Sequence, residues 1–162
     1  MKALKLLVIT FVLGLFQLAL PQYLMVFGVK PDFLLVIVVI ASLSLRMRWA
    51  ILFGASVGLF KDIFGFNGFG LNILLFSCWS FLIVKISRKV SIEDAVVAAL
   101  LAFVIALLQN IVSGLALIYS GVSVPAGIFL RIVILGSFYT ALTLPLILKA
   151  IKPGFLCLSE AQ

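Results

Sequence analysis

The sequence predicts an all-α integral membrane protein that folds as a single bundle of about six transmembrane helices. Hydrophobic residues make up 65% of the 162 residues, charged residues only 10%, and the mean hydropathy is +1.41. Such a composition is typical of membrane proteins and excludes a soluble domain. Because one spanning helix needs about 20 mostly apolar residues, the chain has room for about six spans with short connections. We expect residues 1–152 to form the bundle and residues 153–162 to form a short cytoplasmic tail.

The basic residues lie singly between the apolar runs and define the expected topology. With both termini in the cytoplasm, nine of the 12 Lys and Arg residues fall on the cytoplasmic side, and only Lys30, Lys61 and Arg131 fall outside. This asymmetry follows the positive-inside rule. The net charge of +7 forms no single basic stripe, so we expect contact with membrane lipid and no binding of nucleic acid.

The first two apolar runs differ in length. The run from residue 1 to about residue 27 is too long for a typical signal-peptide core, so we predict a retained membrane helix. Pro31 and Asp32 precede the second run, residues 33–45, where the carboxylate is placed to cap a helix. At about 1.5 Å per residue this run covers only about 20 Å. It would therefore span only if it tilts little and borrows flanking residues, and we expect it to be partly surrounded by protein.

The third run, from residue 49 to about residue 64, combines glycines with a charged pair. On a helix Gly54, Gly58 and Asp62 share one face, because each follows the last by four residues. Small residues at this spacing let a second helix approach closely in lipid. One interpretation buries Asp62 at the end of this face and pairs it with a Lys or Arg, for which Arg131 is the candidate. The other treats the glycines as ordinary membrane-helix residues and places Asp62 at the water interface.

Three further runs complete the predicted bundle. We expect helices over residues 71–84, from residue 95 to about residue 119, and from about residue 127 to about residue 149. Gly68 and Gly70 lie in the connection before the first of these runs. Glycine permits the positive dihedral angles that a tight turn at this point would need.

We do not expect an enzyme. The sequence contains no His, no H-E-x-x-H motif and no Cys pair at ligand spacing, so we predict no catalytic residue, no metal site and no cofactor. Ion transport would use Asp62, but no second buried acid is available for a relay. Two classes remain: a module that binds other membrane proteins, and a module that binds a small solute through groups such as Asn72, Asn110 and Arg131.

The middle third of the sequence resembles the MreD family of bacterial rod shape-determining membrane proteins. The matching segments are Pro31 and Asp32 before an apolar run, then Gly54-x-x-x-Gly58-Leu59-Phe60-Lys61-Asp62, then Gly68-x-Gly70-Leu71-Asn72. The similarity in layout covers nearly the whole chain, but its specificity rests on these segments. Lys61 departs from the apolar residue expected at its position. We assign structural or partner-contact roles to Pro31, Asp32, Gly54, Gly58, Asp62, Gly68, Gly70, Asn72 and Arg131.

The resemblance implies a non-catalytic protein of the bacterial cytoplasmic (inner) membrane that acts in lateral peptidoglycan synthesis during rod-shaped growth. Such proteins are thought to bind MreC directly, and through it the MreB filament, the glycosyltransferase RodA and penicillin-binding protein 2. Our first hypothesis is that the glycine face of residues 54–62 docks a partner's single helix. The family fold is thought to resemble the substrate-binding subunit of energy-coupling factor transporters. The alternative function is therefore a membrane subunit that binds a small, vitamin-like solute for a transporter of this type.

Overall fold

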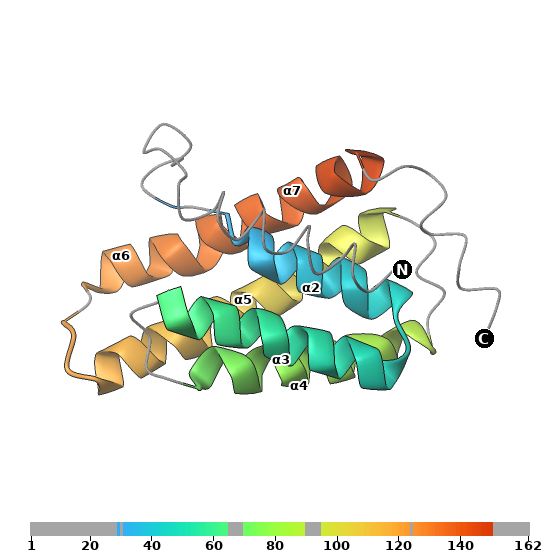
Figure 1. Ribbon diagram of the computed structural model, residues 1–162. Coiled ribbons are helices and arrows are strands. Elements are labelled where there is room, and N and C mark those ends of the chain that lie inside the picture. Colours follow the sequence, from blue (N-terminus) through green and yellow to red (C-terminus); the bar gives the residue numbers. More distant parts are fainter. Residues whose placement is uncertain (1–28, 30, 65–69, 90–94, 124, 151–162) are drawn as a thin grey trace.

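The structure, a computed structural model, describes residues 29, 31–64, 70–89, 95–123 and 125–150 as a set of packed helices (Figure 1). These are α2 (Phe33–Ser44), α3 (Met47–Phe64), α4 (Leu71–Ser87), α5 (Ala95–Tyr119), α6 (Ala126–Arg131), the π-helical turn η2 (Ile132–Gly136) and α7 (Ser137–Ala150). The all-α prediction is confirmed, and the predicted runs end within three residues of the observed boundaries. The predicted helix over residues 1–27 and the tail 153–162 lie outside the described residues.

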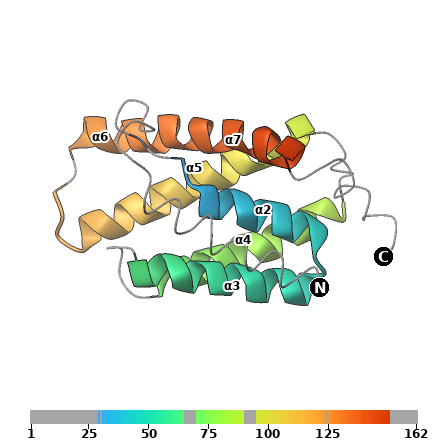
Figure 2. The same ribbon diagram turned by 45° about the horizontal axis from the view of Figure 1, so that its top comes forward.

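Helix α2 is the centre of the bundle. It lies between α7 on one side and the α3 and α4 pair on the other (Figures 1 and 2). Its nine residues from Leu34 to Ser42 are all buried, as expected for a helix that is apolar on every side. Its 12 residues are about 18 Å long at 1.5 Å per residue. The expectation that this short run is surrounded by protein is confirmed.

The helices around α2 form two pairs. Helix α3 packs along α4, while α5 packs along η2 and α7. Helices α4 and α5 follow one another in the chain but touch only over a short stretch. The two pairs therefore diverge, and a groove of about 350 Å³ with apolar walls lies between α4 and α5.

The last predicted run is continuous but not one regular α-helix, because η2 interrupts it. Near this turn, hydroxyl groups bond to carbonyls of the preceding turn: Ser137 Oγ donates to Val133 at 2.6 Å and Thr140 Oγ1 donates to Gly136 at 2.7 Å. Back-bonding of this kind bends helices and satisfies the hydroxyl inside an apolar bundle. The sequence analysis did not foresee the π-helical turn.

Two stretches of the described chain are long and apolar enough to cross a membrane. They are Val96–Tyr119, in α5, and Ala126–Ile147, which runs through α6, η2 and α7. Helices α2 and α4 are apolar but shorter. Helix α3 is 18 residues long but contains Arg48, Lys61 and Asp62. For α3 to cross a membrane, neighbouring helices must supply partners for these charges.

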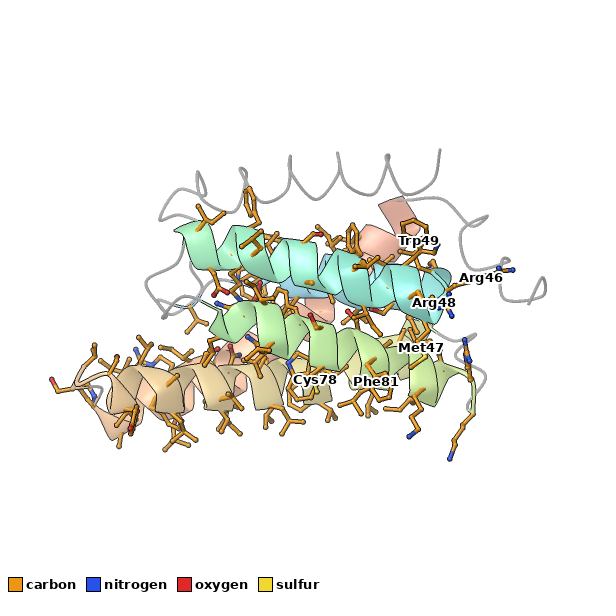
Figure 3. All side chains as sticks on the ribbon, turned by 60° about the horizontal axis from the view of Figure 1, so that its bottom comes forward. Arg46, Met47, Arg48, Trp49, Cys78 and Phe81 are labelled. Atoms are coloured by element: carbon orange, nitrogen blue, oxygen red, sulfur yellow. The ribbon has the colours of Figure 1, made fainter. Side chains whose placement is uncertain are left out.

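Exposed cations gather at one end of the bundle, where α3 begins and α4 ends. Figure 3 shows Arg46, Arg48 and Trp49 there, with Phe81 on α4 toward the same end. The described acidic residues, Asp32 and Asp62, lie at the opposite end, at the start of α2 and near the end of α3. We call the cationic end the basic end and define it by five exposed residues: Arg46, Arg48, Lys85, Arg88 and Lys89.

Candidate functional site

Asp62 is buried against the first turn of α4, with 5% of its surface exposed. Its Oδ1 accepts hydrogen bonds from the backbone N–H of Asn72 at 3.2 Å and from Asn72 Nδ2 at 2.8 Å. Its Oδ2 accepts from the backbone N–H groups of Gly70 and Ile73, each at 3.1 Å. A carboxylate on α3 thus caps α4, where free amides and the helix dipole favour negative charge. We call Asp62, Gly70, Asn72 and Ile73 the capping site.

The predicted ion pair between Asp62 and Arg131 is wrong. Both oxygens of Asp62 are used by donors of α4, and Arg131 is exposed at the end of α6. Asp62 is 5% exposed, so its carboxylate faces protein and not water. Backbone amides at the start of a helix therefore replace the cation that the sequence analysis expected.

Glycine is required where the chain enters α4. Gly70 has a φ of 100°, in the left-handed region, and stands at the N-cap of the helix. Residues with a Cβ rarely adopt this conformation, so Gly70 can turn its N–H toward Asp62 without strain. Gly68 lies outside the described residues.

The glycine face of α3 packs against α4 of the same chain. A Cβ at Gly58 would lie 2.5 Å from the carbonyl oxygen of Asn72 and 2.6 Å from Cα of Ile73. A Cβ at Gly54 would lie 2.7 Å from the carbonyl oxygen of Phe76. These are backbone atoms, so a side chain at either glycine would force the two helices apart. The hypothesis that a partner's helix docks on this face does not fit this packing.

An ion pair lies beside the capping site. Lys61 Nζ forms an ion pair with Asp32 Oδ2, and the two side chains are 22% and 15% exposed. Asp32 also caps α2, because its Oδ1 accepts from the N–H of Leu35 at 3.2 Å. The backbone N–H of Asp32 donates to Thr140 Oγ1 at 3.0 Å. Asp32, preceded by the buried Pro31, therefore joins α2 to α3 and α7, and Lys61 has its partner within the chain.

We expect Lys61→Met to lower the free energy of unfolding by about 1 kcal/mol, because the partly buried Asp32 carboxylate loses its cation. A double-mutant cycle with Asp32→Asn, measured by unfolding in detergent micelles, should give a coupling energy of about 1 kcal/mol. Lys85→Met, at an exposed lysine, is the control and should change little. Strictly additive effects of the two substitutions would show that the ion pair does not stabilise the fold.

Buried amide groups connect the capping site to α5. Gln109 is 1% exposed, and its Nε2 donates to Asn72 Oδ1 at 3.2 Å and to Ser113 Oγ at 3.3 Å. Its Oε1 accepts from the indole Nε1 of Trp79 at 2.7 Å. The hydrogen bonds run from Asp62 through Asn72 and Gln109 to Trp79, and so link α3, α4 and α5. The sequence analysis missed Gln109, although a polar residue inside an apolar helix is itself an indication of a buried partner.

The polar residues suggested for a solute site have separate positions and partners. Asn72 uses its amide for Asp62 and Gln109, and Asn110 Nδ2 donates to Ser137 Oγ on α7 at 3.1 Å. Neither of these two asparagines nor Arg131 lines the groove between α4 and α5. In the part of the chain that the structure describes, no three His, Cys, Asp or Glu residues are grouped as metal ligands would be.

Comparison with known proteins assigns the chain to a family. The family model for rod shape-determining protein MreD matches residues 2–152. Comparison with curated proteins and with solved structures gave no match. The matched region contains the capping site, the ion pair of Asp32 with Lys61, and the glycine face of α3. The match extends over nearly the whole sequence, and the chain therefore belongs to the MreD family of rod shape-determining membrane proteins.

Proposed function

We propose that this protein is a non-catalytic subunit of the cell-elongation machinery, which helps to determine rod shape by binding an MreC-like partner. The family match over residues 2–152 is the observation that carries the proposal. The partner connects the protein to MreB, RodA and penicillin-binding protein 2, and in this way to lateral peptidoglycan synthesis. The protein is a multi-pass protein of the bacterial inner membrane.

The use of the polar side chains supports a scaffold rather than a reacting site. A carboxylate offers about four acceptor positions, and Asp62 fills them with four hydrogen bonds from α4. The side-chain amide of Gln109 likewise forms its hydrogen bonds with residues of α4 and α5. Groups that hold helices together in this way are not free to bind or activate a substrate. The binding function is therefore assigned to the outer surface of the bundle.

Charge supports an orientation for this scaffold. The basic end carries five exposed cations, whereas at the opposite end Lys61 is paired with Asp32. The positive-inside rule favours the basic end in the cytoplasm. The capping site then lies toward the outer half of the membrane.

The outer face of α6, η2 and α7 suits a partner's membrane helix. Large apolar side chains stand at every fourth residue along it, and each is more than half exposed: Leu130, Ile134, Phe138, Leu142 and Leu146. This row covers about 24 Å at 1.5 Å per residue, which is most of the roughly 30 Å hydrocarbon core. A single spanning helix can pack along such a row over most of its length.

The test is affinity capture of the tagged protein from gently solubilised membranes of a rod-shaped bacterium, with a photo-crosslinking residue at Phe138 or Leu142. We expect an MreC-like protein and cell-wall synthases to be recovered, with the adduct formed to the MreC-like protein. The matched control places the crosslinker at Leu74 on α4, which is also exposed, and should give no such adduct. Recovery of cytoplasmic ATPases with a coupling membrane subunit would instead identify a solute transporter and overturn the proposal.

A further inference from the structure

The groove between α4 and α5 is lined by residues of both helices, from Trp79 to Ile86 on α4 and from Val96 to Leu108 on α5. Nearest the basic end, the lining includes Ile86, one residue before the end of α4, and Val97, near the start of α5. Farthest from the basic end it includes Trp79 and Leu108, with Leu82 and Val104 between. The hydrogen bond from Trp79 to Gln109 joins the two helices there at 2.7 Å. A buried polar bond therefore ties α4 to α5 at the end of the groove away from the basic end.

The end of α4 that lines the groove also carries three cations of the basic end, and we call this end of the groove its mouth. Lys85, Arg88 and Lys89 are all exposed. Lys85 directly precedes the lining residue Ile86, and the backbone N–H of Lys89 donates to the Ile86 carbonyl at 2.9 Å. Lys85 Nζ lies 5.8 Å from the centre of the Phe81 ring, which holds the ammonium close to the end of α4. The groove thus combines apolar walls with positive charge at its mouth.

The length of the groove distinguishes between two kinds of occupant. From Val96 to Leu108 it follows α5 for 13 residues, whose 12 rises of 1.5 Å cover about 18 Å. Half of a roughly 30 Å hydrocarbon core is about 15 Å, so the groove has the depth of one leaflet. A partner's spanning helix would need the full thickness, whereas the Trp79 to Gln109 bond joins α4 to α5 at one end of the lined stretch. A lipid chain needs only one leaflet.

We propose that this groove binds one anionic phospholipid of the surrounding bilayer. An acyl chain lies in the groove against Trp79, and the phosphate lies among Lys85, Arg88 and Lys89. Basic sites between membrane helices on the cytoplasmic side are known to hold acidic headgroups. The chain length, the apolar walls and the charge at the mouth all match this ligand. The assignment does not depend on which protein partner is bound.

Trp79 supplies a reporter inside the groove. The sequence has two Trp residues, and Trp49, which is 61% exposed, is replaced in a Trp49→Phe background. This protein is reconstituted in bilayers of phosphatidylcholine that contain brominated phosphatidylglycerol or brominated phosphatidylcholine. Bromine quenches Trp fluorescence only at contact, so the quenching of Trp79 measures occupancy. We expect about a fivefold preference for phosphatidylglycerol, the effect expected for one favourable contact with a Lys or Arg.

Two matched pairs of variants separate the charge from the groove. Replacing Lys85, Arg88 and Lys89 with Gln should remove the preference for phosphatidylglycerol, whereas Arg46→Gln with Arg48→Gln, at the same end but on α3, should keep it. Val104→Phe, which fills the groove, should reduce quenching by both lipids, whereas Leu115→Phe, outside the groove on α5, should not. Val104 and Leu115 are 47% and 55% exposed, so neither change disturbs the core.

Three results would overturn the proposal. The first is equal quenching by the two lipids in the parent protein. The second is a preference that survives loss of the three cations. The third is efficient crosslinking from Leu100, in the groove, to a protein partner while brominated lipid fails to quench Trp79, since the groove would then hold a polypeptide. Loss of partner capture at α7 with lipid binding intact would contradict the proposed function alone.

Discussion

Gly58→Ala is expected to lower the free energy of unfolding by about 3 kcal/mol, although it adds a single methyl group. The new Cβ would lie 2.5 Å from the Asn72 carbonyl oxygen and 2.6 Å from Cα of Ile73. Both are backbone atoms of α4, so the helices must separate, and overpacking of this kind typically costs 1–3 kcal/mol. The same shift pulls the amides of Asn72 and Ile73 away from Asp62. Unfolding in detergent micelles, followed by Trp fluorescence, measures the loss.

Gly127→Ala is the matched control for this prediction. A Cβ at Gly127 in α6 would meet no atom within 4 Å, so we expect no loss and a slight gain from the lower flexibility of the unfolded chain. If Gly58→Ala unfolds like the parent protein, α3 and α4 are not packed as described. The glycine face is internal, so weaker capture of a partner by a Gly58 variant is interpreted only after the stability of that variant has been measured.

Asp62→Ala is expected to lower the free energy of unfolding by a similar amount, about 3 kcal/mol. Three backbone N–H groups, those of Gly70, Asn72 and Ile73, lose their acceptor at the buried start of α4. An unsatisfied buried donor costs about 1–3 kcal/mol, and loss of a cap alone costs about 1 kcal/mol. Amide hydrogen exchange should rise first in the opening turn of α4, which distinguishes a lost cap from general destabilisation.

Ile63→Ala is the control for Asp62→Ala. Ile63 is the next residue of α3 and is 56% exposed, so its truncation removes few packed atoms and should change stability by less than about 1 kcal/mol. Equal effects of the two substitutions would mean that the carboxylate does not hold α4.

The helices were predictable because their ends carry clear markers. Arg46 and Arg48 interrupt the apolar pattern between α2 and α3, and Gly70 marks the start of α4. Asp32 was correctly expected to cap α2, since an Asp before an apolar run satisfies the first amides of a helix. The π-helical turn η2 could not be predicted, because its five residues, Ile132–Gly136, have the composition of an ordinary membrane helix.

The candidate site was predictable in its residues but not in its partners. The spacing of Gly54, Gly58 and Asp62 predicted the packing face, and burial of the acid was one of the two interpretations that it left open. It could not tell a helix of the same chain from a helix of another protein, because small residues permit close approach by either. Nor could it distinguish backbone amides from Arg131 as the groups that balance the charge of Asp62. Which groups bind the Asp62 carboxylate depends on the position of the first turn of α4 relative to the end of α3.

The bonds around α3 also determine how this part of the chain enters the bilayer. Helix α3 carries Lys61 and Asp62 near its end, and either charge alone makes insertion of an isolated helix costly. Lys61 is neutralised only when α2 brings Asp32, and Asp62 is satisfied only when α4 brings its amides. We therefore expect helices α2, α3 and α4 to insert stably only as one unit, once the chain has been synthesised up to Ile73.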